Sequence, residues 1–348
     1  MKIASFFSGA GGLDLGFTNV GFKLAFANDN WNGCWETFEK NHGIEINKKS
    51  IADIKPHEIP DVVGFVGGPP CQSWSLAGAM RGINDPRGRL FYDYVNLIAA
   101  KKPLFFLAEN VAGIISPKHL PEFLKIIEAF KKIGYNVSYK LLDAKDFGVP
   151  QERKRVIIVG YHENLGKKFE FPKPQAEKVS LKEAIGNLPE PIPASKNNKT
   201  NGFTAKIPNH EFMNGGFSTI YMSRNRVRNW DEQSFTIQAG GRHAPIHPQA
   251  PKMKFIEQNK REFIKGKEHL YRRLSVRECA RIQTFPDDFI FYYEQVADGY
   301  KLIGNAVPVK LAEALAKQII KDLKELDIRS KVCQINSMPR QEVKLCLG

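Results

Sequence analysis

The amino-acid sequence predicts an α/β fold in which a large domain carries a second, smaller and more irregular domain. In the first 160 residues, short apolar runs alternate with segments whose apolar residues recur at helical spacing. After Gly160 prolines and polar residues become frequent, and the helical pattern returns near Asp298. Strands that alternate with helices are typical of a parallel sheet covered on both faces, which binds ligands at the carboxyl ends of its strands.

The expected elements follow from the spacing of apolar residues along the chain. We expect strands over residues 2–7, 23–27, 62–66, 104–108, 137–142 and 156–160. We expect helices over residues 31–41, 90–100, 120–133 and 309–323. Pro308 suits the first turn of the last helix, because a proline there removes no intrahelical hydrogen bond. Residues from about 327 to 348 show no clear period and are expected to form a tail.

A change in composition divides the chain into two expected domains. Five prolines between Pro172 and Pro193 lead into a polar stretch over residues 195–201. Residues 195–273 contain 15 Lys and Arg but only 6 Asp and Glu, and they show few clear helices. We therefore expect a large domain over residues 1–185 and 285–348, and a smaller, irregular, basic domain over residues 186–284.

Charge and cysteine content narrow the class of protein. The 348 residues include 51 Lys and Arg against 37 Asp and Glu, a formal net charge of +14 that favours a polyanionic partner. No apolar run approaches the about 20 residues that span a bilayer, and glycines from Gly9 onward interrupt any N-terminal signal core. The five cysteines lack zinc-ligand spacing, so we expect free thiols, no metal site and a cytoplasmic location.

A glycine-rich turn follows the first expected strand. The glycines from Gly9 to Gly12 allow backbone to approach a ligand closely, although a tight turn alone would also explain them. Asp29 ends the next strand, where an acid can bind ribose hydroxyls. Asp53 ends the following segment and could accept a hydrogen bond from an adenine amino group. Three successive segment ends with this chemistry favour an adenosine-containing cofactor.

Two glycines and two prolines precede Cys71 at the end of the third expected strand. This stiff turn presents the thiol at the carboxyl edge of the sheet, where a thiolate would be a strong nucleophile. The alternative is a small buried thiol, which is the usual place of a free cysteine. That alternative is what we expect for Cys34 and Cys279, which lie in helical stretches.

Charged side chains follow the next strands. Glu109 comes directly after an apolar strand and is costly to bury unless it is paired, so it is a candidate general acid beside the nucleophile. A surface residue at a strand end is the alternative. Alternation along an extended segment would place Arg153 and Arg155 on one face, where they suit an anion or a carbonyl oxygen. A solvated charge run is the alternative there.

The basic region contains side chains that read bases. Arginine and glutamine recognise guanine and adenine edges, which makes candidates of Arg224, Arg226, Arg228, Gln238 and Arg242. For any single arginine, a merely solvated basic face remains open.

Taken together, the segments resemble the bacterial DNA (cytosine-5)-methyltransferases. The family's motifs occur in its order from Phe6 to about Ile320: F-x-G-x-G-G, G-G-P-P-C-Q-x-x-S, E-N-V, Q-x-R-x-R, R-x-L-[ST]-x-R-E and G-N-A-V-P. The resemblance implies a Rossmann-like domain dependent on S-adenosylmethionine and a smaller target-recognition domain. The C-terminal helix would then return to the catalytic domain.

The resemblance also implies a role for each matching residue. Phe7 would stack on the adenine, Asp29 would bind the ribose, and Asn30 stands where the family often has tryptophan. The cofactor-binding set would be Phe7, Gly9, Gly11, Gly12, Asp29, Asp53, Ile54, Pro70 and Asn305.

The same resemblance implies a chemical mechanism. Cys71 would add to C6 of a flipped-out cytosine, Glu109 would hold N3, and Arg153 or Arg155 would steady the ring oxygen. The segment over residues 72–89 would close over duplex DNA. Contacts with DNA would come from Ser75, Arg81, Arg89, Arg224, Arg226, Arg228, Gln238 and Arg242.

Residues 201–253 resemble most the enzymes that methylate the inner cytosine of GGCC, with a departure at residues 240–245. Double-stranded DNA is the expected partner, a cognate restriction endonuclease is a candidate one, and we expect a monomer. Three alternatives stay open: the same chemistry on tRNA, a catalytically silent DNA-binding relative, and a Rossmann-type oxidoreductase. The last lacks the full phosphate-binding signature after the first strand.

Overall fold

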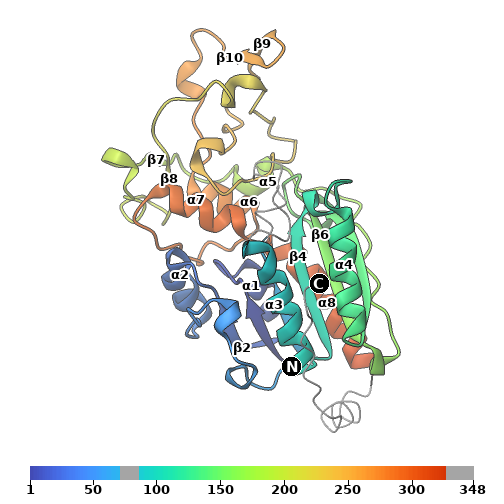
Figure 1. Ribbon diagram of the computed structural model, residues 1–348. Helices are drawn as coiled ribbons and strands as arrows, with labels where there is room; N and C mark the ends of the chain where they lie inside the picture. The colour runs from blue at the N-terminus through green and yellow to red at the C-terminus, as the bar shows by residue number, and fades with distance from the viewer. Residues whose placement is uncertain (71–85, 327–348) are drawn as a thin grey trace.

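The computed structural model describes residues 1–70 and 86–326 and shows an α/β fold around one mixed sheet (Figure 1). The six strands lie in the order β2-β1-β3-β4-β6-β5. Their bounds are β1 Lys2–Phe6, β2 Lys23–Asn28, β3 Gly64–Gly67, β4 Phe105–Val111, β5 Tyr135–Asp143 and β6 Lys154–His162. Every expected strand is confirmed to within a few residues.

The direction of the strands corrects one expectation. Strands β1 to β4 pair in parallel, but β6 runs antiparallel to both β4 and β5. The expectation of an all-parallel sheet is therefore wrong for β6. The reason is the short connection between β5 and β6, which contains only the turn Ala144–Phe147 and no crossover helix. Without a crossover, the next strand must return in the opposite direction.

The helices cover both faces of the sheet, as expected. Their bounds are α1 Gly12–Asn19, α2 Asn32–His42, α3 Pro86–Lys101, α4 Leu120–Lys132, α5 Leu181–Ile185, α6 Val276–Ile282, α7 Val296–Asn305 and α8 Val309–Glu325. Helices α1 and α8 pack on one face, and α3 and α4 pack on the other. Consecutive side chains of β4 point to opposite faces of the sheet, so Phe105 and Phe106 are fully buried in two different cores.

The last helix returns to the sheet from the far end of the chain. Helix α8 packs against α1, where a Cβ on Gly16 would collide with the side chain of Ala312. Only a glycine lets the two helices approach this closely. Helix α8 therefore packs against the same face of the sheet as α1.

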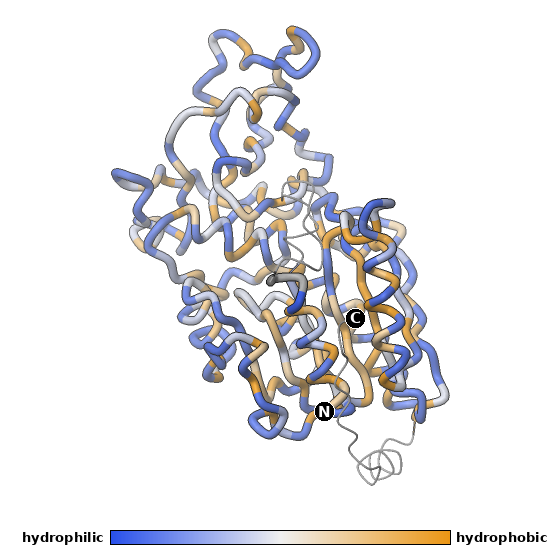
Figure 2. The backbone as a smooth tube through the Cα atoms, in the orientation of Figure 1, coloured by the Kyte–Doolittle hydropathy of each residue, from blue (hydrophilic) through white to orange (hydrophobic). Residues whose placement is uncertain are grey.

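The basic region is irregular, and it has a small core of its own. Residues 186–284 contain the helix α6 and four short strands, which are β7 Ile192–Pro193, β8 Glu211–Phe212, β9 Lys254–Glu257 and β10 Lys260–Glu262. Tyr221, Val227, Ile246, Met253 and Tyr271 belong to a hydrophobic cluster separate from the cores of the sheet. The residues of the basic region are mostly hydrophilic, whereas apolar residues predominate in the sheet (Figure 2). Within the described residues, no helix is long and apolar enough to cross a membrane.

Candidate active site

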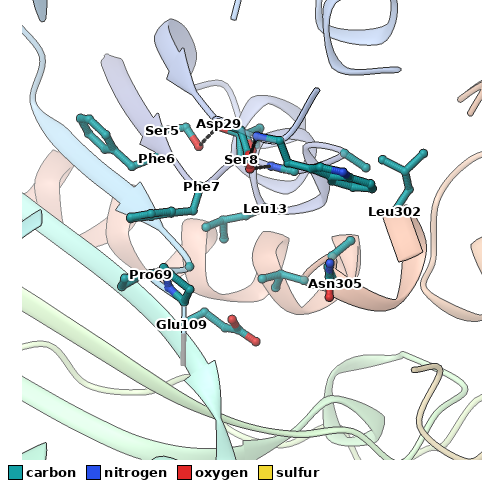
Figure 3. Close-up of a pocket in the computed structure, with 18 of the residues that line it drawn as sticks. Ser5, Phe6, Phe7, Ser8, Leu13, Asp29, Pro69, Glu109, Leu302 and Asn305 are labelled. Atoms are coloured by element: carbon teal, nitrogen blue, oxygen red, sulfur yellow. Dashed lines mark hydrogen bonds between the residues drawn. The ribbon is translucent and has the colours of Figure 1, made fainter. Parts of the chain in front are cut away.

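A pocket of about 480 Å³ lies at the carboxyl ends of β1, β3 and β4. The strand ends contribute Phe7, Gly9, Asp29, Pro70 and Glu109, among others, and Figure 3 shows several of these side chains around one space. The end of α7 adds Lys301, Leu302 and Asn305, which come from far along the chain. The structure therefore brings together segments that the sequence only predicted to share an edge.

The turn after β1 owes its shape to glycines and to one unusual phenylalanine. Gly9 has a φ of +55° and Gly11 a φ of +85°, values that favour glycine. A Cβ on Gly12 would collide with the backbone carbonyl of Val307. Phe7 itself has a φ of +54°, which is rare for a non-glycine residue and is found at functional sites.

Asp29 directly follows the carboxyl end of β2 and is held in place by two backbone N–H groups. Its carboxylate accepts hydrogen bonds from the N–H of Gly9 at 2.9 Å and of Trp31 at 2.8 Å. Burial raises the pKa of Asp29, and these two N–H groups oppose that rise. The carboxylate is thus held in one orientation in the wall of the pocket.

Asp14 is a second acid in the pocket wall, and motif reasoning missed it. Its carboxylate is fully buried and makes no hydrogen bond of good geometry with any described residue. Burial raises the pKa of Asp14 to about 7, and the nearby Ser5 hydroxyl only partly opposes this. The Ser5 hydroxyl is not aligned for a hydrogen bond with this carboxylate. A buried polar group without a partner in a pocket fits a site built for a polar ligand.

Glu109 forms an ion pair with Arg155 at the end of the pocket. Arg155 Nε lies 2.8 Å from Glu109 Oε1, and Glu109 is only 9% exposed. The antiparallel register of β4 and β6 places Arg155 opposite Val111, two residues from Glu109. The reversed direction of β6 is therefore what brings the arginine to the acid.

The turn that leads to Cys71 is fixed beside this pair. The Asn110 side-chain amide donates to the carbonyl of Pro69 at 3.1 Å. Pro69 and Glu109 lie close together in Figure 3. Cys71 itself, like Ser75 and Arg81, lies outside the described residues.

Arg153 does not share the place of Arg155, which corrects the expectation that both arginines face one site. It is 1% exposed, and its guanidinium donates to the carbonyls of Ile237 at 2.9 Å, Gly304 at 2.8 Å and Ala306 at 3.0 Å. The reason is that β6 begins at Lys154, so the alternation of a strand does not extend to Arg153. Arg153 therefore links the backbone at Ile237 to the backbone at Gly304 and Ala306.

Four expected cofactor residues lie outside the pocket lining, namely Gly11 and Gly12 in the turn after β1, and Asp53 and Ile54. Asp53 is exposed in the turn Ile51–Asp53, near Asp93 of α3. Ile54 is buried in the core cluster against which Phe7 packs. Their contact with an adenine stays a prediction.

The residues expected to contact DNA fall into two groups. Arg89, Arg224, Gln238 and Arg242 are exposed. Arg226 instead donates to the carbonyls of Ile220 and Tyr221. Arg228 pairs with Glu152 at 2.6 Å and Glu232 at 3.3 Å. The last two thus have partners within the protein.

Several other residues that line the pocket, Lys301 and Trp31 among them, were not expected from the sequence. Lys301 Nζ lies 3.8 Å from the ring centroid of Trp31, and both side chains line the pocket. A helical reading of the residues before Asn305 could have found Lys301, because residues four apart share a face.

Cys34 and Cys279 are buried, as expected. Residues 1–70 and 86–326 contain no cluster of three or more side chains suited to a metal ion.

Comparisons with known proteins identify the family. A model of C-5 cytosine-specific DNA methylases matches residues 1–321. Type II methyltransferase M.MthTI of Methanothermobacter thermautotrophicus is 69% identical over 323 residues, which cover 93% of this chain and 98% of the relative. Type II methyltransferase M.FnuDI of Fusobacterium nucleatum is 53% identical over 323 residues, 92% of this chain and 94% of the relative.

Solved structures share the fold. A crystal structure of Spodoptera frugiperda DNMT2 has a TM-score of 0.66 and 19% identity, over 92% of this chain and 99% of that one. A structure of the Entamoeba histolytica methyltransferase EhMeth has a TM-score of 0.67 and 17% identity, over 93% and 98% of the two chains. With the family match over nearly the whole chain, the conclusion is direct: the chain belongs to the C-5 cytosine-specific DNA methylases and is a DNA (cytosine-5-)-methyltransferase.

Proposed function

We propose that the pocket binds S-adenosylmethionine and that the enzyme methylates a cytosine flipped out of duplex DNA. The observation that carries this proposal is the continuity of one pocket from Phe7 and Asp29 to Glu109. A cofactor held by the first two residues would lie beside the acid that faces the base.

The cofactor would be held by residues of all the contributing segments. Phe7 would stack on the adenine, and Asp29 would accept hydrogen bonds from the ribose hydroxyls. The Gly9–Gly12 turn would hold the methionine end, near the Asp14 carboxylate, which has no hydrogen-bond partner among residues 1–70 and 86–326. Pro70 and Asn305 would close the site, and the Lys301 ammonium would face the cofactor carboxylate. Asp53 and Ile54 complete the proposed adenine contacts.

Cysteine addition would make the poorly nucleophilic C5 reactive. The Cys71 thiolate would form a bond to C6, and the electrons of the C5–C6 double bond would move to C5. S-adenosylmethionine, when bound, would supply an electrophilic methyl group to C5 and would remain as S-adenosylhomocysteine. Loss of the C5 proton to a base and cleavage of the Sγ–C6 bond then restore the double bond. The product is 5-methylcytosine with the thiol free again.

The Glu109–Arg155 pair would hold the flipped base during these steps. Arg155 Nε occupies one carboxylate oxygen of Glu109, which leaves the other oxygen to hold N3 and the amino group. Arg155 would also donate to the ring oxygen of cytosine. Flipping the base costs about a few kcal/mol, and these contacts would offset part of that cost.

We also propose the recognition site and the partners. Residues 186–284 would form the target-recognition domain, and the likeness of residues 201–253 to GGCC-specific enzymes favours GGCC. Arg224, Gln238 and Arg242 are exposed and so are available to DNA. A monomer that acts beside a cognate restriction endonuclease fits a type II methyltransferase.

A trapping experiment tests the covalent step. DNA with 5-fluorocytosine at the target position cannot lose a proton from C5, so the adduct with Cys71 should persist in denaturing gels. The adduct should require S-adenosylmethionine, should form in a Cys333→Ser control, and should be absent in Cys71→Ser. An adduct in the Cys71→Ser protein, or none in the folded wild-type protein, would contradict the proposal.

A further inference from the structure

The segment that carries Gln238 and Arg242 is held by the large domain. We call residues 234–242 the recognition segment. The N–H of Ser234 donates to the carbonyl of Pro150, and the N–H of Glu152 donates to the carbonyl of Ser234. The Thr236 hydroxyl donates to the Glu152 carbonyl at 2.6 Å. The start of the recognition segment is therefore paired with the residues just before β6.

Helix α7 forms the seat for the next part of the recognition segment. A Cβ on Gly304 would collide with the backbone carbonyl group of Gln238. A Cβ on Gly241 would lie 2.7 Å from atoms of Met213 and of Tyr300. At Gly304 a larger residue would require the backbone of Gln238 to shift, whereas at Gly241 the side chains of Met213 and Tyr300 would have to move. The exposed side chains of Gln238 and Arg242 thus project from a backbone lying directly on α7.

Arg153 locks this contact from inside the protein. One guanidinium nitrogen donates to Ile237, next to Gln238, and the other donates to Gly304 and Ala306 at the end of α7. The Gln151 side chain adds a parallel link, since it accepts from the N–H of Ile237 and donates to Gln283. A rigid planar fork is suited to joining two backbones at a fixed separation.

The same helix supplies the cofactor pocket. Lys301, Leu302 and Asn305 line the pocket, while Tyr300 and Gly304 contact the recognition segment. Figure 1 shows α7 between the sheet and the region of β9 and β10. The backbone of Gln238 is therefore separated from the pocket by little more than the last turn of α7.

We propose that Arg153 is a positioning residue that sets the choice of DNA site. It fixes the position of Gln238 and Arg242 relative to the cofactor pocket. These two side chains can then contact their bases only when the target cytosine is aligned with Cys71. This inference rests on the proposed function, because it requires that the recognition segment reads DNA. It predicts that loosening the junction relaxes selectivity without removing the cofactor site.

Two variants loosen the junction, and a third is the matched control. Arg153→Lys keeps the charge but cannot join both backbones, and Gly304→Ala pushes the recognition segment off α7. Gly299→Ala also introduces a Cβ into α7, but that atom would meet the Tyr293 ring at 2.7 Å. The measurements are methylation rates on the mapped site and on sites changed at one base pair, the affinity for S-adenosylhomocysteine, and the melting temperature.

The expected result is a fall of about tenfold in the ratio of cognate to altered-site rates for Arg153→Lys and Gly304→Ala. Affinity for S-adenosylhomocysteine should stay within about threefold in both. Gly299→Ala should lower the melting temperature and leave the ratio unchanged. Equal loss of rate on every site, with an unchanged ratio, would overturn the inference. A wild-type protein that methylates no DNA site would overturn the proposed function as well.

Discussion

The carboxyl edge of the sheet and the basic stretch over residues 221–247 differ in what decides the role of a charged residue. At the sheet edge, Asp29 and Glu109 lie in the pocket because Asp29 directly follows β2 and Glu109 lies near the carboxyl end of β4, and these strands are set by local pattern. In the basic stretch, Arg224 is exposed, but Arg226 and Arg228 bind carbonyls and carboxylates of the protein. In regular structure the sequence pattern predicts where a charged side chain will lie. In an irregular region the role of a charged side chain depends on its tertiary contacts.

The largest effect should come from the acid at the sheet edge. Glu109→Gln keeps the shape of the side chain but removes its charge, so single-turnover methylation should slow about 10²- to 10⁴-fold. Affinity for DNA should change little, because most DNA affinity comes from phosphate contacts. An unchanged single-turnover rate would remove Glu109 from the chemistry and would make the sheet edge as hard to interpret as the basic stretch.

The proposed contact of Asp29 with the ribose should give the next largest effect. Asp29→Asn should weaken S-adenosylhomocysteine binding about 10- to 100-fold, since hydrogen bonds to a charged group are worth about 1.5–3 kcal/mol. The exposed neighbour Asn30 is the matched control, and Asn30→Ala should change the affinity only a few-fold. Calorimetric titration gives both values. Equal losses in the two variants would argue that the edge acts only through its shape.

Asp14 gives a prediction about pH. Its pKa is raised from 3.8 to about 7, so the folded chain keeps a proton that the unfolded chain releases between about pH 4 and 7. The stability that the folded protein gains from keeping this proton is fully present below about pH 4 and is lost as the pH rises to about 7. Asp14→Asn stays neutral, so its gain in melting temperature over the wild type should be a few degrees larger at pH 8 than at pH 5.

The control for Asp14 is the exposed Asp231. Asp231→Asn should show the same small difference from the wild type at both pH values. Burial lowers the pKa of His42 and of His247 to about 4, which opposes the trend, but both histidines are present in every protein compared. A gain for Asp14→Asn that does not depend on pH would contradict a buried, ionisable carboxylate at this position.

The smallest effects separate two arginines of the basic stretch. Arg224→Ala should reduce the slope of log affinity for DNA against log salt by about one, as loss of one phosphate contact does. Arg228→Ala should leave the slope unchanged and lower the free energy of unfolding by about 0.5–1 kcal/mol, because it breaks partly exposed ion pairs. The same slope change in both variants would show that Arg228 leaves its partners to bind DNA.

Sequence reasoning was reliable for features that depend on local pattern. The strands and the buried places of Cys34 and Cys279 follow from apolar spacing alone. It failed where a long-range contact decides. The direction of β6 depends on a connection too short for a helix, and the burial of Arg153 depends on carbonyls of Ile237 and Gly304, far along the chain.

The site shows the same division. The pocket residues that end strands were expected, but Asp14, Trp31 and Lys301 were not, because each resembles an ordinary helix residue in the sequence. Lys301 reaches the pocket only because α7 crosses the end of the sheet. No local pattern specifies that crossing.

The most direct test of the central claim is a base-resolution map of methylation. The protein would be incubated with S-adenosylmethionine and unmethylated DNA of diverse sequence. We predict 5-methylcytosine at the inner cytosine of GGCC and at no other motif. An absence of 5-methylcytosine in DNA, from a protein shown to be folded and bound to cofactor, would contradict the account.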